Sequence, residues 1–304
     1  MSADFQLLKG FDFNASTPYL WVFKDSAKDI RFVTNYVQTD DALNNEIISF
    51  VNNEMTRITE HSPYSHISQN NENSCLVLNK SSTNFPLLQV QVDRLETENR
   101  IEGAAALKGS KGYVVKFVHN NVIVYAVRRS TSTFKTAYGK RFINIVFRDG
   151  ELSGIQDNSF SIEKSFDFYV INDSIFIANK NGFEAAIQHR TQYIQAFLQL
   201  QQSNDFRSLF TEMDPITDYI GSNSIQLRRM SVVQARSIYT DPNFISNLQR
   251  VNTTEHWGIN FDTVTNKIIP CEDTMKTILT VLLDHLLMSR VTNINYEVPD
   301  SIQV

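Results

Sequence analysis

The sequence predicts an α+β protein with an antiparallel central sheet built from hairpins and a largely helical C-terminal half. Three observations lead to this prediction. Apolar runs are separated by short turn pairs over residues 113–178. Beyond residue 180 the apolar spacing changes to the i, i+3, i+4 pattern of helices. With 42% hydrophobic residues and 21 Phe among 304 residues, the chain has enough apolar surface to bury the core of such a fold.

Two hairpins form the expected centre of the sheet. Asparagine tolerates positive φ, so Asn120-Asn121 and Asn172-Asp173 are suited to two-residue turns. The strand-like runs lie at residues 113–118, 122–127, 142–147 (before Asp149-Gly150), 168–171 and 175–178. Because consecutive runs are joined by short turns, we expect them to pair antiparallel.

The first hundred residues mix expected strands with one clear helix. Asp40 or Asp41 is a suitable N-cap for a helix that runs to about Ile58, with apolar side chains along one face. Residues 61–74 are polar and rich in Asn and Ser, which indicates an exposed loop. Residues 93–111 fit either a helix or a connection. Short apolar runs are expected as strands at residues 20–23, 30–37, 75–78 and 87–92.

A helix is expected to follow the second hairpin. Asn181 and Glu184 have the spacing of an N-cap and its capping-box partner, and an apolar face continues to about Gln202. Further short helices are expected near residues 204–212 and 231–249, and strands at 257–261 and 294–298. We divide the chain into a mixed region around the sheet, 1–180, and a mainly helical region, 181–304, which either form two domains or one continuous domain.

The last expected helix opens at Glu272 and Asp273, whose negative charge suits the positive end of a helix. Its apolar stripe is wide and consists of Met275, Ile278, Leu279, Leu282, Leu283, Leu286 and Leu287. Burial inside the fold is the simpler interpretation, and the width also fits a homodimer in which part of the stripe meets a second copy. In that arrangement Leu279, Leu283 and Leu286 are buried within the monomer, and Asp284 and His285 are exposed at its rim.

Positive charge is concentrated in the middle of the chain. The whole sequence carries a net charge of −5 at pH 7. Residues 101–150, however, contain nine Lys/Arg against two acids, whereas the counts are eight against thirteen before this segment and eleven against eighteen after it. A local excess of this kind indicates a site for an anionic partner.

The sharpest part of this basic region is residues 128–141, RRSTSTFKTAYGKR, which holds five cations and no acid. Lys and Arg beside hydroxyl donors are typical of contacts to phosphate oxygens, and the segment is expected to be a loop between two strands. The alternative is a solvated loop that pairs with the acidic flanks of the same molecule. The candidate phosphate-binding residues are Lys108, Lys111, Arg128, Arg129, Lys135, Lys140 and Arg141.

Signatures of catalysis are absent from the sequence. His61 and His66 lack the spacing of a helical zinc pair, and there is neither a Gly-x-Ser-x-Gly elbow nor an acid-x-Lys half-motif of metal-dependent nucleases. Asp167, Asp173 and Glu184 lie near the expected sheet and are the candidates for an unrecognised nuclease site. We expect a non-enzymatic protein that uses no cofactor and no metal.

The remaining features favour a cytoplasmic protein. Cys75 and Cys271 are far apart and match no metal or redox spacing, so two free thiols in a reducing compartment are expected. The first residues show no basic segment followed by an apolar one, as a signal peptide would. The longest apolar stretch is interrupted by Asp284 and His285, so we expect no membrane span.

Two passages carry a family resemblance. GYVVKFVHNNVIVYAVRR (residues 112–129) is a strand-turn-strand that ends in basic residues, and FDFYVINDSIFIANKNGFEAAI (residues 166–187) continues it. Together with LWVFK at residues 20–24 and the leucine-rich helix ending in Leu-Met-Ser, they resemble the bacterial Kiwa protein KwaB-like family over nearly the whole chain. The shared features are structural patterns rather than catalytic residues, so no functional residue is carried over.

The resemblance implies a role in a two-gene anti-phage system. Members of this family are the soluble component, described as binding double-stranded phage DNA and acting against phage replication or transcription. Their partner is KwaA-like, a small multi-pass inner-membrane protein, which implies peripheral attachment to that membrane. The leading hypothesis is a DNA-binding effector. The alternatives are a nuclease, or an interaction module that binds anionic lipid or an acidic protein.

Overall fold

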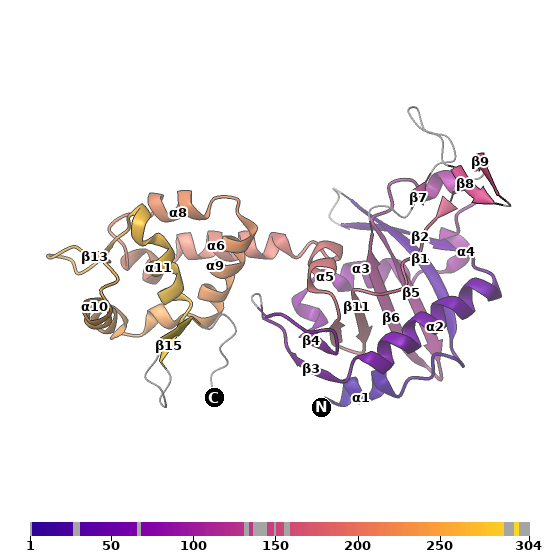
Figure 1. The fold of residues 1–304 in the computed structure, drawn as a ribbon, viewed down its shortest axis with the longest axis horizontal. Coiled ribbons are helices and arrows are strands. Elements are labelled where there is room, and N and C mark those ends of the chain that lie inside the picture. Colours follow the sequence, from indigo (N-terminus) through magenta and orange to yellow (C-terminus); the bar gives the residue numbers. More distant parts are fainter. Residues whose placement is uncertain are drawn as a thin grey trace. The chain divides into compact units, whose positions relative to one another are not determined.

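The computed structural model describes residues 2–26, 31–65, 68–130, 134–135, 145–148, 150–154, 159–288 and 295–297 (Figure 1). The chain forms two compact units. Unit 1 consists of Met1–Tyr64 and Gln69–His189, and unit 2 consists of Ser65–Ser68 and Arg190–Val304. The α+β prediction is confirmed, because a mostly antiparallel sheet dominates unit 1 and helices dominate unit 2.

An eight-stranded sheet forms the centre of unit 1. Its spatial order is β2-β1-β5-β6-β11-β12-β4-β3, and every neighbouring pair is antiparallel except the parallel pair of β3 and β4. The strands are β1 (Thr17–Asp25), β2 (Phe32–Val37), β3 (Glu60–Pro63), β4 (Ser74–Asn79), β5 (Gly112–His119), β6 (Val122–Arg129), β11 (Phe168–Ile171) and β12 (Ser174–Ile177).

Both expected hairpins are present. Asn120 and Asn121 adopt φ of 49° and 62° between β5 and β6, and Asn172 adopts φ of 50° between β11 and β12. These left-handed conformations match the twist of the flanking strands. The expected single sheet over residues 113–178 is wrong in one respect, because the intervening strands form separate two-stranded sheets. They are β7 (Phe134–Lys135) with β10 (Ser159–Phe160), and β8 (Ile145–Arg148) with β9 (Glu151–Gly154).

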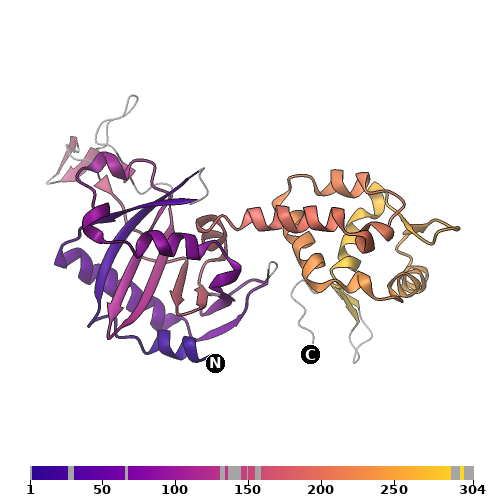
Figure 2. The ribbon, with the colours of Figure 1, turned by 180° about the vertical axis from the view of Figure 1, so that it is seen from behind.

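Helices cover both faces of the central sheet. On one face lie α1 (Ala3–Lys9) and α2 (Asp41–Arg57), which bury Phe5 and Ile47 against strand residues such as Val115 (Figure 1). On the other lie α3 (Phe85–Val92) and α5 (Lys180–Ala186), which bury Leu88 and Phe183 (Figure 2). Alternate strand residues supply the two cores, because successive side chains point to opposite faces. Shorter turns complete the unit: η1 (Lys80–Ser82), α4 (Glu96–Asn99) and η2 (Ala104–Leu107).

Two local predictions in unit 1 have clear outcomes. Asp40 caps α2 as expected, since its side chain accepts from the backbone N–H of Leu43 at 2.8 Å. The strand expected at residues 87–92 is instead part of α3. Its buried side chains Phe85, Leu88 and Val92 follow helical spacing, whereas the Gln-Val-Gln-Val alternation misled the prediction.

The helix expected from Asn181 to Gln202 is two helices. Asn179, not Asn181, is the N-cap of α5, and its side chain accepts from Gly182 N at 3.3 Å. Glu184 is therefore not a capping partner. It is 7% exposed, and its Oε1 accepts the Tyr64 hydroxyl at 3.1 Å. The chain breaks at Gln188, where φ is 54°, before α6 begins.

Unit 2 is a helical unit with its own core. Phe206, Met230 and Ile278 lie near its centre and are almost fully buried. Its helices are α6 (Arg190–Gln202), α7 (Asn204–Ser208), α8 (Asp214–Ile220), α9 (Ser224–Arg236), η3 (Ile238–Thr240), α10 (Phe244–Glu255) and α11 (Glu272–Leu282). Its short strands are β13 (Asn260–Phe261) with β14 (Ile268–Ile269), and β15 (Leu286–Met288) with β16 (Asn295–Glu297).

The wide apolar stripe of α11 belongs to this core. The helix ends at Leu282, and Asp284 turns the chain with φ of 53°. The expected burial of Leu279 and Leu283 is confirmed, and Met275, Ile278 and Leu282 are equally buried. Leu286 is only half-buried, and His285, expected at an exposed rim, is 3% exposed. These five residues of the stripe, from Met275 to Leu283, are buried inside unit 2 and offer no apolar surface to a second copy. The homodimer therefore stays a prediction that the stripe does not support.

Truncating the stripe should destabilise unit 2 strongly. We expect Leu279→Ala to lower the free energy of unfolding by about 2–5 kcal/mol, because a buried leucine leaves a cavity that the core fills only in part. Lys276→Ala, an exposed position on the same helix, should change it by less than about 0.5 kcal/mol. Urea unfolding followed by circular dichroism measures both. Equal, small effects would contradict the placement of Leu279 in the core.

Candidate nucleic-acid interface

Four of the seven candidate residues gather at one end of the unit 1 sheet. Arg128 and Arg129 end β6, and Lys111 directly precedes β5. Lys111 N donates to Phe23 O at 2.8 Å and Lys111 O accepts from Ser130 N at 2.9 Å, so the ends of β1, β5 and β6 meet there. Lys108 lies just before Lys111 in the chain and is exposed. This end of the sheet is where the basic segment 128–141 begins.

The other three candidates cannot be located as side chains. Lys135 belongs to β7, for which the structure describes the backbone but not the side chains. Lys140 and Arg141 lie outside the described residues. Lys108 and Lys111 form no ion pair with any residue that the structure describes. They are therefore the described members of the set whose charge is not already matched.

Arg128 is bound within the fold rather than presented to solvent. Its side chain is 16% exposed and forms ion pairs with Asp167, at 2.8 Å, and with Glu163. Asp167 is 1% exposed and uses both oxygens: Arg128 and Asn179 donate to Oδ1 at 2.8 Å, and the backbone N–H of Arg129 donates to Oδ2 at 2.6 Å. A buried carboxylate with a cation and two further donors is a satisfied structural group.

The backbone of Asp167 is tied in as well. Its N–H donates to Val127 O, and its carbonyl accepts from the N–H groups of Ala178 and Asn179, each at 2.8 Å. Helix α5 then closes over the carboxylate at Gly182, where a Cβ would lie 2.0 Å from Asp167 Oδ1. Any larger residue at position 182 would displace the carboxylate, so glycine is required by this contact.

Burial and charge oppose each other in this group. Burial raises the pKa of Asp167 to about 6, although Arg128 and the donated hydrogen bonds act in the opposite direction. Burial alone would lower the pKa of Arg128, but Asp167 and Glu163 outweigh it and raise that pKa. Burial opposes ionisation of Glu163, but the contacts with Arg128 and Ser130 together outweigh it and leave the pKa of Glu163 lowered. At neutral pH the group therefore holds a cation between two carboxylates.

Two further cations of the basic region are also paired. Arg129 contacts Asp25 at 3.2 Å, and Lys116 contacts Asp93 at 2.8 Å. Asp93 additionally accepts the hydroxyl of Tyr125. The alternative expected from the sequence for the segment 128–141, pairing with the acidic flanks, therefore describes Arg128 and Arg129, and Lys116 is paired in the same way. The sequence did not identify these acids as the partners of the cations, because each acid lies more than twenty residues along the chain from its cation.

The three acids considered for a nuclease site do not come together. Asp167 precedes β11 and Asp173 follows it, so the strand separates them by about 13 Å. Asp173 is largely exposed and pairs with Lys80 at 3.3 Å, and Glu184 on α5 accepts from the hydroxyl of Tyr64, which follows β3. Within the described ranges, no group of three His, Cys, Asp or Glu side chains is arranged to hold a metal ion.

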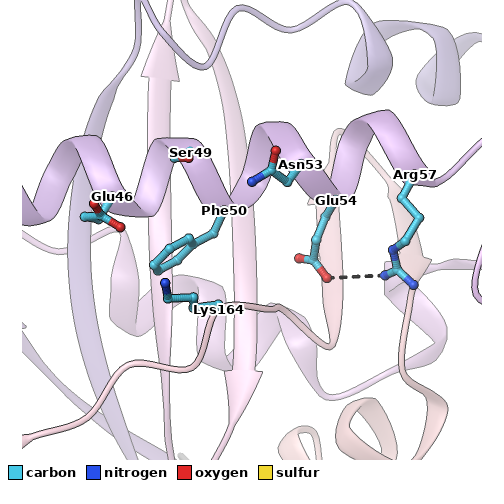
Figure 3. A pocket seen from close by; sticks show the side chains of 7 residues that line it. All are labelled: Glu46, Ser49, Phe50, Asn53, Glu54, Arg57 and Lys164. Carbon is cyan, nitrogen blue, oxygen red and sulfur yellow. Dashed lines mark ion pairs between the residues drawn. The ribbon is translucent and has the colours of Figure 1, made fainter.

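A groove that the sequence did not reveal runs along α2 (Figure 3). It is lined by Glu46, Ser49, Phe50, Asn53, Glu54, Arg57 and Lys164. Glu54 is 6% exposed and accepts from Phe166 N at 2.8 Å and from the Tyr169 hydroxyl, and burial raises its pKa. Two cations and two carboxylates balance each other here, so the groove does not select an anion.

The helices give no membrane-crossing candidate in the part of the chain that the structure describes. None of them combines the length and the apolar character that a bilayer crossing requires.

Comparison with known proteins matches the chain to a protein family. A family model described as Kiwa protein KwaB-like matches residues 107–292, from just before β5 to beyond α11. No curated protein and no solved structure matches the chain.

The buried carboxylate gives stability a pH dependence of defined sign. The pKa of Asp167, about 6 in the folded state, exceeds that of an unfolded aspartate, so the folded state binds this proton more tightly. The contribution to stability is greatest below about pH 4 and is lost as pH rises to about 6, by roughly 3 kcal/mol at most. Urea unfolding of wild type and of Asp167→Asn between these pH values should show this loss as a changing difference between the two proteins. A constant difference would contradict it.

Proposed function

The chain belongs to the KwaB-like family, and on this premise we propose that it is the DNA-binding effector of a Kiwa-type anti-phage system. It would act without catalysis, blocking replication or transcription of double-stranded phage DNA. It would reside in the cytoplasm, held at the inner membrane through a KwaA-like multi-pass partner. Self-association as a dimer is part of the same proposal.

The observation that supports DNA binding is the gathering of cations at one end of the sheet. Lys108, Lys111 and the start of the 128–141 segment share that end, and the segment adds three cations, Lys135, Lys140 and Arg141. Cations on loops, without a helix placed to enter a groove, contact phosphates rather than base edges. Binding would therefore be electrostatic and weakly dependent on sequence.

The ion pairs define which cations are available for this role. Arg128 and Arg129 are engaged with Asp167, Glu163 and Asp25, so a phosphate would have to displace a carboxylate from them. Charge reversal at Arg128 would place three carboxylates together and destabilise the fold by about 3–5 kcal/mol. A test of DNA binding must therefore use the remaining cations.

We expect Lys140→Glu/Arg141→Glu and Lys108→Glu/Lys111→Glu each to weaken binding of double-stranded DNA by about tenfold or more, without a large change in thermal stability. The affinity of the wild type should fall with salt with a log–log slope of about −3 to −5, as expected for four or five neutralised phosphates. Fluorescence anisotropy with labelled duplex DNA measures both quantities.

The matched control is Arg250→Glu/Lys276→Glu, which reverses two exposed cations in unit 2 and should leave DNA affinity close to that of the wild type. Equal weakening by all three variants would reduce the effect to net charge. A salt-independent affinity, or unaltered binding in both basic-region variants, would remove this surface from the proposal. Flotation with anionic liposomes identifies the alternative of a lipid-binding module.

Absence of catalysis is a separate part of the proposal. We expect no cleavage of DNA with Mg²⁺ or Mn²⁺. Glu184→Gln should keep phage defence intact, because the amide oxygen of glutamine still accepts from the Tyr64 hydroxyl. A plaque assay and a cleavage assay on the same variant test this. Cleavage by the wild type that disappears in Glu184→Gln would establish the nuclease alternative.

A further inference from the structure

The apolar face of α10 is incompletely covered within unit 2. Phe244, Leu248 and Val251 lie on one face of the helix, at i, i+4 and i+7. Of the residues in α10, only Leu248 is buried, and Phe244 and Val251 are half-buried. A helix with this spacing normally buries the whole face against its own core. The exposed remainder forms the floor of a pocket.

The pocket has a volume of about 310 Å³ and lies between α10 and the end of α11. Trp257, Val281 and Leu286 complete its apolar wall. The space is sufficient for one large side chain or two smaller ones, at the lower limit of natural ligand pockets. Seven of the ten residues that line it are apolar, so an occupant would insert an apolar group.

Two carboxylates stand at the rim. Asp241 and Asp284 line the pocket and are both exposed, and no cation is among its ten described lining residues. Asp284 is fixed by the turn that ends α11, where its φ is 53°. Asp241 is fixed by the hydrogen bond that its Oδ1 accepts from Asn243 N at 2.8 Å. Asp241 and Asp284 are far apart in the chain, but both place a negative charge beside the same apolar pocket.

This combination selects an occupant of defined chemistry. A lysine or arginine would contact Asp241 and Asp284 and could also lie over the ring of Trp257. An aliphatic or aromatic neighbour would fill the pocket. We propose that the pocket binds a short segment of the KwaA-like membrane partner in which a cationic residue stands beside an apolar one. Cytoplasmic loops of multi-pass membrane proteins are enriched in Lys and Arg, which gives the partner the required charge.

The inference rests on the proposed function for the existence of the partner and adds the place and chemistry of contact. It also separates two surfaces by charge: cations of unit 1 for DNA, and carboxylates of unit 2 for the partner. Each surface should fail independently when its own charges are changed.

The test is co-purification of the two full-length proteins from membranes solubilised in detergent. The variant is Asp241→Asn/Asp284→Asn, which removes both charges. Asparagine keeps the acceptor for Asn243 N and tolerates the positive φ at position 284. We expect recovery of the partner to fall roughly tenfold, while DNA affinity and melting temperature stay as in the wild type.

The control is Glu212→Gln/Asp218→Asn, which removes two exposed carboxylates of unit 2 outside the pocket and should leave recovery unchanged. Asn247→Arg, an exposed position at the pocket on α10, is a second variant that should reduce recovery by repelling a cation. It keeps the test decisive if the double variant is unstable. Wild-type recovery in both pocket variants would overturn the proposal, as would failure of the wild type to recover the partner while it still binds DNA.

A direct readout is the fluorescence of tryptophan. The chain has two tryptophans; Trp21 is fully buried in unit 1 and Trp257 lines the pocket. Peptides that tile the cytoplasmic loops of the partner should change the emission only when they carry a cation beside an apolar residue. The change should be absent in Trp257→Phe. A response to neutral or acidic peptides alone would overturn the assignment.

Discussion

The buried carboxylate of Asp167 is the constraint on which unit 1 depends. It joins the end of β6, the start of β11 and the first turn of α5 through its backbone and both oxygens. Removing such a charge from water is costly, and Arg128 and the donated hydrogen bonds offset this cost in part. The glycine at position 182 and the guanidinium of Arg128 are therefore consequences of one requirement, a fully satisfied carboxylate at a crowded junction.

This constraint changes the meaning of the basic segment. A run of cations read along the sequence appears uniform, yet Lys116 on β5 and Arg128 and Arg129 on β6 are paired with carboxylates of the fold. Charge density in sequence overstates the charge that is free for a ligand. Among the described candidates only Lys108 and Lys111 lack a carboxylate at contact distance, so the charge available to an anionic ligand is smaller than the sequence suggests.

The sequence predicted those features that depend on neighbouring residues. Asn120-Asn121 specifies its turn through local backbone preference, and the wide stripe of α11 specifies burial through spacing. The prediction was wrong for α3, where the Gln-Val-Gln-Val alternation of a strand overlaps the helical spacing of the buried residues. It was also wrong for the start of α5, where Asn179 and Asn181 are both suitable N-cap residues and Asn179 is the one used. The ion pairs and both pockets were beyond reach, because they join residues distant in the chain and leave no local pattern.

The strand order has a consequence for synthesis of the protein. The middle of the sheet, β5-β6-β11-β12, comes from residues 112–177, whereas both edges, β2-β1 and β4-β3, come from the first eighty residues. Strands β1 and β2 can pair with each other, as can β3 and β4, but the inner edges of β1 and β4 have no partner until the centre has left the ribosome. During this interval these two edges are open to association with other nascent chains. Because pairing between distant segments closes slowly, we expect the yield of folded protein to depend on how soon the central hairpins are completed.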